Sequence, residues 1–175
     1  MNPKSKTRLK KFTVYFFLIL AAHIFQNVIT FFPKLGGVRP VLLISAVIGV
    51  AMFEGEIVGA VAGIFAGALW DTVTVFADGY NALILMAICA VSGVILRIFL
   101  QNNMLTFVLV NTVVTVFYFI TYALFFVTSR GLDNAGWLFI RYYLPMALYS
   151  VALTPLCYLV INFVNRKIPV KYIEY

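Results

Sequence analysis

Charged side chains are scarce in this chain of 175 residues: they make up 11% of it, and only six of them are acidic. A water-soluble domain carries roughly 25% charged residues. A folded chain of the present composition therefore lacks the polar side chains that would cover a water-exposed surface. Apolar residues make up 63% of the chain, and the mean hydropathy is +1.01. The composition excludes an ordinary soluble domain and predicts an integral membrane protein.

Metal-binding and catalytic residue types are nearly absent as well. The chain has one histidine and two cysteines, and His23, Cys89 and Cys157 lie in separate apolar runs. No Ser/His/Asp grouping, HExxH, GxxxxGK[ST] or carboxylate pair with a plausible base occurs in the sequence. We therefore expect no metal, no cofactor, no disulfide and no enzymatic activity. The excess of basic residues has no interleaved aromatic pattern, so we expect no binding of nucleic acid.

Long apolar runs fill most of the sequence and predict an all-α polytopic fold. Lipid cannot pair backbone N–H and C=O groups, and the runs lack the alternation of a barrel strand, so the spans must be helices. At roughly 20 residues a span, the chain has room for six. We expect transmembrane helices at about 12–32, 38–53, 57–76, 80–97, 104–128 and 137–164, with tails at 1–11 and 165–175. The second is the shortest and has Pro40 near its start, which favours a short, tilted or partly re-entrant segment.

The distribution of basic residues predicts the orientation. Nine of the thirteen Lys and Arg residues fall on the side of the two termini, and four fall on the other side. Basic residues stay preferentially in the cytoplasm, so both termini are predicted to be cytoplasmic. The basic N-terminal segment suits the anionic headgroups of the inner leaflet. A cleavable signal peptide over 1–32 is the alternative, but the apolar run is too long for one.

Glycines recur every four residues through the third predicted span, at Gly55, Gly59, Gly63 and Gly67, and the series ends at Asp71. Small residues at this spacing let two membrane helices approach closely. Two interpretations stay open. The bare face packs against another helix of the same chain, or it forms a groove that receives the helix of a partner.

Asp71 lies on the same helix face, near the outer end of the span. A carboxylate costs about 2.5–3.5 kcal/mol at the bilayer centre, so it normally has a partner or lies in water. Arg39 and Arg141 are candidate partners because both are predicted on the outer side, and Asn81 in the first turn of the next helix is another. We expect these four residues to form a polar site with a conformational or interaction role. Simple hydration of Asp71 at headgroup depth is the alternative.

Four polar residues form a stripe along the fifth predicted span. Asn111, Thr115, Tyr118 and Tyr122 fall at i, i+4, i+7 and i+11, which places them on one helix face. Such a stripe faces protein and not lipid. It either makes hydrogen bonds between helices, which is the commoner case, or lines a ligand cavity.

Residues 35–97 resemble the central region of the bacterial rod shape-determining protein MreD family. The likeness is carried by a span that starts at Pro40, the Glu54-Gly55 turn, the small-residue repeat that ends at Asp71, and the helix start Gly79-Tyr80-Asn81-Ala82-Leu83. The length and the basic N-terminus suit that family too. One departure is Val41, which stands where family members often carry an acidic residue, so no role is expected for a charge there.

The resemblance implies a non-enzymatic component of the cell-elongation (rod) machinery in the cytoplasmic membrane. Members work with MreC, alongside the MreB filament, the RodA glycosyltransferase and a class B penicillin-binding protein, in side-wall peptidoglycan synthesis. Their fold resembles the six-helix substrate-binding subunit of energy-coupling-factor vitamin transporters, and a subunit of that kind is the alternative function. Against it, the first span lacks an Ala-x-x-x-Ala pattern, since Phe25 and Gln26 follow Ala21 and Ala22 four residues on. The polar stripe keeps the alternative open.

Overall fold

The structure is a computed structural model that describes residues 3–27, 37–74, 79–99, 103–128 and 135–168. All regular elements in these residues are helices, so the all-α prediction is confirmed. They are α1 (Pro3–Asn27), α2 (Leu42–Glu54), α3 (Glu56–Asp71), α4 (Tyr80–Phe99), α5 (Met104–Tyr122), the π-helix η1 (Ala123–Thr128), α6 (Ala135–Leu138), the π-helix η2 (Phe139–Tyr143) and α7 (Leu144–Lys167).

Four helical segments of the described residues are long and apolar enough to cross a membrane: Lys6–Asn27, Tyr80–Ile98, Met104–Phe126 and Gly136–Lys167. The helices expected as the second and third spans are shorter. α2 has 13 residues and α3 has 16, which correspond to about 20 and 24 Å of helix. The hydrocarbon layer is about 30 Å thick. The expectation of six full spans is therefore not confirmed, and the likeness to a vitamin-transporter subunit stays a prediction.

Several boundaries differ from the predicted ones, among them the start of α1 and the end of α3. α1 begins at Pro3, so much of the basic segment expected as a tail is part of the first helix. α3 ends at Asp71, five residues before the predicted end at 76. The sixth predicted span is one continuous series of α6, η2 and α7. Pro145, in the first turn of α7, cannot donate to the carbonyl four residues back and clashes with it, which accounts for a π-helical turn directly before it.

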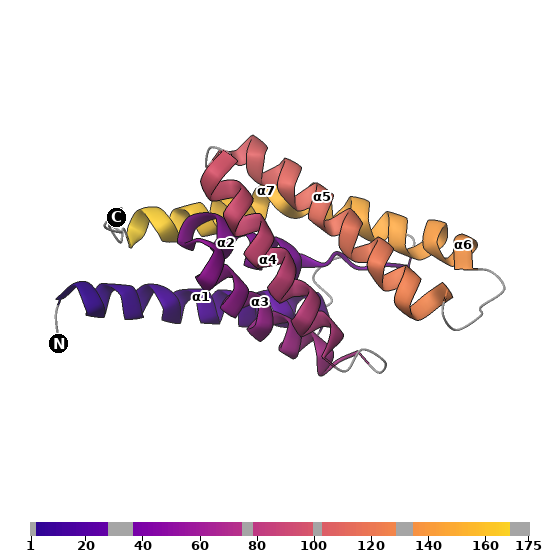
Figure 1. Cartoon of the computed structure of the whole chain (residues 1–175), viewed down its shortest axis with the longest axis horizontal. Coiled ribbons are helices and arrows are strands. Elements are labelled where there is room, and N and C mark those ends of the chain that lie inside the picture. Colours follow the sequence, from indigo (N-terminus) through magenta and orange to yellow (C-terminus); the bar gives the residue numbers. More distant parts are fainter. Residues whose placement is uncertain (1–2, 28–36, 75–78, 100–102, 129–134, 169–175) are drawn as a thin grey trace.

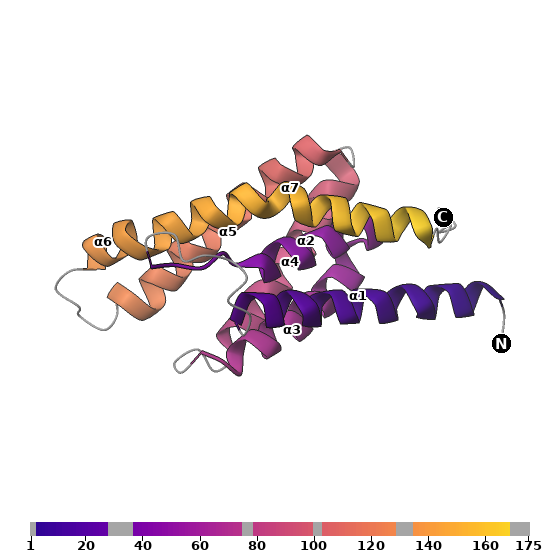
Figure 2. The same ribbon diagram turned by 180° about the vertical axis from the view of Figure 1, so that it is seen from behind.

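α2 lies at the centre of the bundle (Figures 1 and 2). Every residue from Leu42 to Met52 is buried, and α1, α3, α4, α5 and α7 all pack against this helix. A helix that is apolar on every side is stable only when other helices or lipid surround it completely. Here other helices do so, which explains how so short an apolar helix fits a membrane protein.

α1 and α7 run antiparallel along one side of the bundle, and the start of α1 lies at the same end as the close of α7 (Figures 1 and 2). Contacts confirm this, because Lys11 of α1 hydrogen-bonds Asn165 of α7. α3 and α4 form the most extensive helix pair. This arrangement fits the predicted placement of both termini on one side of the membrane; which side that is stays a prediction.

Candidate functional site

The glycine face of α3 lies against other helices of the same chain. Gly59, Gly63 and Gly67 are buried. A Cβ atom on Gly63 would lie 2.5 Å from the carbonyl oxygen of Leu85, and one on Gly67 would overlap the backbone of Ala82. Real Cβ atoms essentially never come within 3.0 Å of such atoms. Only glycine therefore permits the contact of α3 with the backbone of α4. The alternative interpretation was that this face receives the helix of a partner, but α4 lies there.

Gly55 stands apart from this contact. Its φ of +87° belongs to the left-handed region that favours glycine, it forms the turn between α2 and α3, and a Cβ there would meet nothing within 4 Å. Gly93 of α4 supplies a further close contact, since a Cβ on it would lie 2.6 Å from the Cα of Glu56. Gly93 was not singled out from the sequence because it is the one glycine of α4 and belongs to no glycine repeat.

The Asp71 carboxylate at the end of α3 caps the start of α4. Its Oδ1 accepts a hydrogen bond from the backbone N–H of Asn81 at 3.2 Å, and its Oδ2 accepts one from the N–H of Ala82 at 3.1 Å. The first N–H groups of a helix have no partner within the helix, and the helix dipole favours a negative charge beside them. Both needs are met by one side chain from the preceding helix.

The arginines expected to pair with Asp71 do not contact it. Arg39 Nη1 donates to the backbone carbonyl of Asn27 at 3.2 Å, and Arg141 is exposed in η2. The two ion pairs found among the described residues involve other side chains. The physical reason for this correction is proximity, because the free N–H groups of α4 follow Asp71 by only ten and eleven residues. Of the candidates, Asn81 is the one that meets Asp71, through its backbone.

Asn81 extends this cap into a joint between three helices. Its side chain is fully buried, its Oδ1 accepts a hydrogen bond from the Tyr118 hydroxyl of α5, and its Nδ2 donates to Thr74 Oγ1 at 3.4 Å. The ring of Trp70 stacks on that of Tyr118 with 5.0 Å between centroids. We call Trp70, Asp71, Asn81 and Tyr118 the polar joint. It fixes the end of α3, the start of α4 and the last part of α5 to one another.

Asn111, farther along the polar stripe of α5, is bonded to two other helices. Its Nδ2 donates to Ser45 Oγ of α2 at 2.9 Å and to Thr154 Oγ1 of α7 at 2.5 Å. Thr115 is buried with no hydrogen-bond partner for its hydroxyl in the described part of the chain. Tyr122, at the other end of the stripe, packs on the ring of Phe126, 4.8 Å between centroids. The stripe thus contacts protein along its length, and none of its four residues lines the apolar grooves between α1 and α7 or between α4 and α5.

The start of α2 is capped from a distance in the same way as that of α4. Gln26 Oε1 of α1 accepts from the backbone N–H groups of Leu42 and Leu43 at 3.1 and 3.2 Å. Ser150 Oγ of α7 accepts from the N–H of Val41 at 2.8 Å. Free N–H groups at a helix start are costly in a membrane interior, where no water can bind them. The bundle meets that need with side chains from its first and last helices.

A buried ion pair between Lys11 and Glu54 was missed by sequence reasoning, which placed both residues in water. The side chains of Lys11 and Glu54 are 1% and 0% exposed. Lys11 Nζ also donates to Asn165 Oδ1 at 2.7 Å, and the Tyr15 hydroxyl donates to Glu54 Oε1 at 3.1 Å. We call these four residues the ionic cluster. The one available signal was that Lys11 and Tyr15 share a helix face if the helix begins before residue 12.

The start of α3 and the end of α4 are joined by a second ion pair, of Arg97 with Glu56 at 3.0 Å. The side chains are 71% and 29% exposed. An exposed pair of this kind contributes about 0–1 kcal/mol, so it adds little to the α3–α4 contact.

Comparison with protein families matches residues 6–167 to rod shape-determining protein MreD. The chain belongs to the MreD family. The match extends the likeness seen over 35–97 to nearly the whole chain. It covers α1 from residue 6 onward and all the later helices up to the end of α7. A search of curated proteins and a search of solved structures gave no match. Membership makes this chain a rod shape-determining membrane protein.

The polar residues of this MreD-family chain are used to hold helices together. The polar joint, the ionic cluster and the caps on α2 and α4 all bind one helix to another. No group of three or more His, Cys, Asp or Glu residues that could hold a metal lies within the described ranges. Cys89 and Cys157 are unbonded and lie on different helices. These contacts among the described residues can fix the shape of a membrane bundle.

Proposed function

We propose that this chain is a non-enzymatic component of the cell-elongation machinery, which binds an MreC-like partner and helps to organise side-wall peptidoglycan synthesis. The observation that carries the proposal is the match of residues 6–167 to the MreD family. The MreB filament, the RodA glycosyltransferase and a class B penicillin-binding protein are the further components beside which it would act. The cytoplasmic membrane, with both termini in the cytoplasm, is the location we propose.

The use of polar groups in the bundle supports a scaffold. A scaffold needs a surface that keeps its shape, and buried hydrogen bonds between membrane helices contribute to that, about 0.6 kcal/mol each on average. We propose that the polar joint serves in this way, by holding the end of α3 and the start of α4 against α5. Because α2 covers Gly59 and α4 covers Gly63 and Gly67, the partner would bind on another surface of the bundle.

The proposal is tested by replacing the MreD-family gene of a rod-shaped bacterium with this one. We expect rod shape to be retained and the tagged chain to bring down the MreC-like protein from native membranes. Gly63→Leu should abolish both, because it separates α3 from α4. Gly136→Leu is the matched control, since a side chain there meets nothing within 4 Å.

The vitamin-transporter alternative makes the opposite prediction for the same purification. A chain that brought down energy-coupling ATPases and bound a vitamin, with no MreC-like protein, would refute the scaffold. Asn111 and Tyr118 of the α5 stripe donate hydrogen bonds to side chains of other helices, which supports interhelical bonding as the role of these two residues.

A further inference from the structure

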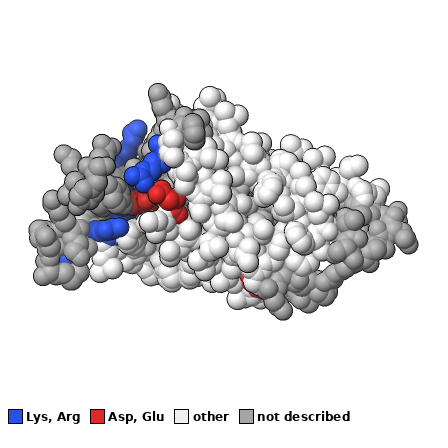
Figure 3. Space-filling view, in the orientation of Figure 1, with Lys and Arg blue, Asp and Glu red and all other residues white. Residues whose placement is uncertain are grey.

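α3 and α4 present a continuous apolar surface on the outside of the bundle. Its exposed side chains come from both helices: Ile57, Val61 and Ile64 of α3, and Val91, Val94 and Ile95 of α4. We call these six residues the α3–α4 face. On the side in view, Figure 3 shows charged atoms gathered toward one end and a broad uncharged surface beyond them. In a membrane such an uncharged surface contacts acyl chains.

Charged groups bound the α3–α4 face at two levels. At one level, Glu56 at the start of α3 pairs with Arg97 near the end of α4. At the other, Asp71 at the end of α3 binds the backbone N–H groups of Asn81 and Ala82 at the start of α4. Between these levels neither helix has a charged residue. The levels are fifteen residues apart along α3 and sixteen along α4, which is about 22 and 24 Å of helix.

This apolar height is too small for an ordinary bilayer. The hydrocarbon layer is about 30 Å thick, so the face falls short of it by about 6–8 Å. α3 and α4 also run obliquely to α1 and α7 (Figures 1 and 2), which reduces their height along the direction of those two helices further. A short apolar stretch is accommodated by flanking side chains that reach toward water, by association with protein, or by a thinner bilayer.

The charged side chains at the two levels are held in place by their partners. Both carboxylate oxygens of Asp71 are bonded to the start of α4, and the Arg97 guanidinium is bonded to Glu56. Neither side chain is therefore free to reach toward the water. Of the three ways to accommodate the short face, this leaves a thinner bilayer or a covering protein.

We propose that the α3–α4 face is matched to a thinned bilayer and binds phospholipids with short acyl chains in preference to ordinary ones. If oleoyl chains suit a layer of about 30 Å, a height of 22–24 Å corresponds in proportion to chains of about 14 carbons. The proposal does not rest on the elongation function, so either can fail without the other.

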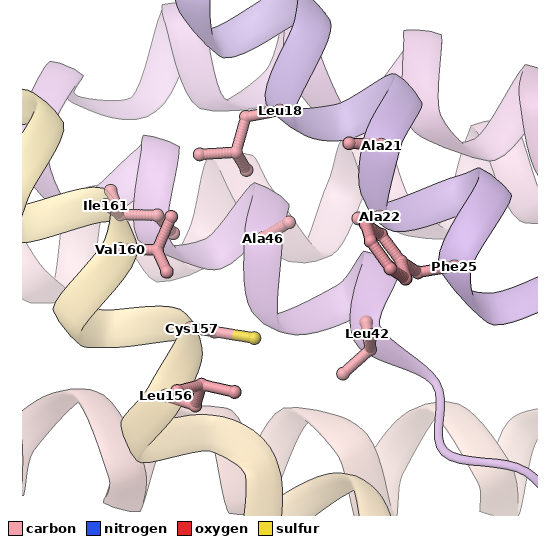
Figure 4. A pocket seen from close by; sticks show the side chains of 10 residues that line it. All are labelled: Leu18, Ala21, Ala22, Phe25, Leu42, Ala46, Leu156, Cys157, Val160 and Ile161. Atoms are coloured by element: carbon pink, nitrogen blue, oxygen red, sulfur yellow. The ribbon is translucent and has the colours of Figure 1, made fainter. Parts of the chain in front are cut away.

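Other sides of the bundle have a full apolar height. The segment Met104–Phe126 has 23 residues, which is about 34 Å of helix. The apolar groove of Figure 4 lies between α1 and α7, whose segments Lys6–Asn27 and Gly136–Lys167 are also long enough to cross a membrane. A bilayer of ordinary thickness suits these sides, so the thinning is expected beside α3 and α4.

The test uses the full chain in bilayers that mix brominated dioleoyl phosphatidylcholine with an unbrominated competitor, either short-chain (dimyristoleoyl) or long-chain (dierucoyl) phosphatidylcholine. Bromine quenches tryptophan on contact, so a tryptophan on one side of the bundle reports which lipid binds there. Val61→Trp places this reporter on the α3–α4 face, and Val113→Trp is the matched control on α5, since both positions are exposed. Both are made with Trp137→Phe, which removes the exposed native tryptophan, while Trp70 is buried.

At Val61→Trp we expect the short-chain lipid to bind about three-fold more strongly than the dioleoyl lipid. At Val113→Trp the dioleoyl lipid should bind at least as strongly as the short-chain one. Adding Glu56→Leu/Arg97→Leu removes one charged level and should reduce the short-chain preference at Val61→Trp. Glu56→Gln/Arg97→Gln keeps a polar level and should leave that preference unchanged. Circular dichroism checks that each variant is folded.

Three results would overturn the proposal. The first is the same chain-length preference at the two reporters. The second is an equal effect of the two double variants on the preference at Val61→Trp. The third is a lack of quenching at Val61→Trp by the brominated lipid, which would show that a second copy or another protein covers the face.

Discussion

Removing the positive charge from the ionic cluster should destabilise the whole bundle. In Lys11→Met the apolar stem of the side chain is kept, but the Glu54 carboxylate stays buried without its counter-ion. Glu54 Oε2 already has no hydrogen-bond partner in the described structure, so Tyr15 is the one side chain left to hold the charge. Loss of one member of a buried ion pair costs about 3–5 kcal/mol. We expect a loss of that size.

The double variant Lys11→Met/Glu54→Gln separates the charge from the packing. With no buried charge left, and with an amide oxygen still able to accept from Tyr15, stability should return to within about 1 kcal/mol of the unmodified chain, because neutral replacement of a buried pair is often without cost. Lys10→Met is the matched control. It makes the same change one position away on an exposed side chain, and surface substitutions are usually within about 0.5 kcal/mol.

The free energy of unfolding can be measured by titrating the purified chain from mild detergent into dodecyl sulfate and following helix content by circular dichroism. If Lys11→Met lowered the free energy of unfolding by less than about 1 kcal/mol, the Lys11–Glu54 pair would contribute no more than an exposed pair such as Arg97–Glu56. That result would contradict the argument from burial. A double variant no more stable than the single one would show that the lysine acts through packing, and the electrostatic argument would be refuted.

Five further variants test the α3–α4 contact and the polar joint, in the same assay. Gly63→Leu should cost more than about 3 kcal/mol, beyond ordinary overpacking, since backbone blocks the new side chain; Gly136→Leu should be neutral, and a stable Gly63→Leu would contradict the contact. Asp71→Ala should cost about 1–2 kcal/mol by uncapping α4, whereas Asp71→Asn, which keeps one acceptor, should cost less. Tyr118→Phe should cost about 0.6–1.7 kcal/mol, and no change would mean that its bond to Asn81 contributes nothing.

The helices and the α3 face were accessible to sequence reasoning because membrane helices and small-residue contacts have a direct pattern. The position of α2 was not. An apolar run such as 38–53 has the same sequence pattern whether lipid or protein surrounds the helix. Its length was the one usable sign, and it predicted a short segment without saying that other helices enclose it.

The backbone N–H groups that bind Asp71 were not predicted, for a related reason. A sequence displays charged side chains, so the two arginines on the same predicted side were the visible candidates. The backbone N–H groups of Asn81 and Ala82 are present in every helix start and leave no mark in the sequence. Lys11 escaped notice because a lysine at the end of an apolar run is usually in water, and here the packing of α2 and α7 beside α1 encloses it.

The enclosure of α2 also sets the order in which the chain completes its fold. A helix of 13 residues is too short to cross the membrane alone, and the helices that enclose α2 come from both ends of the sequence. The N–H of Val41 is bound by Ser150, 109 residues later. Synthesis must therefore reach α7 before α2 is fully held. Until α7 is made, α2 lacks one of the helices that enclose it.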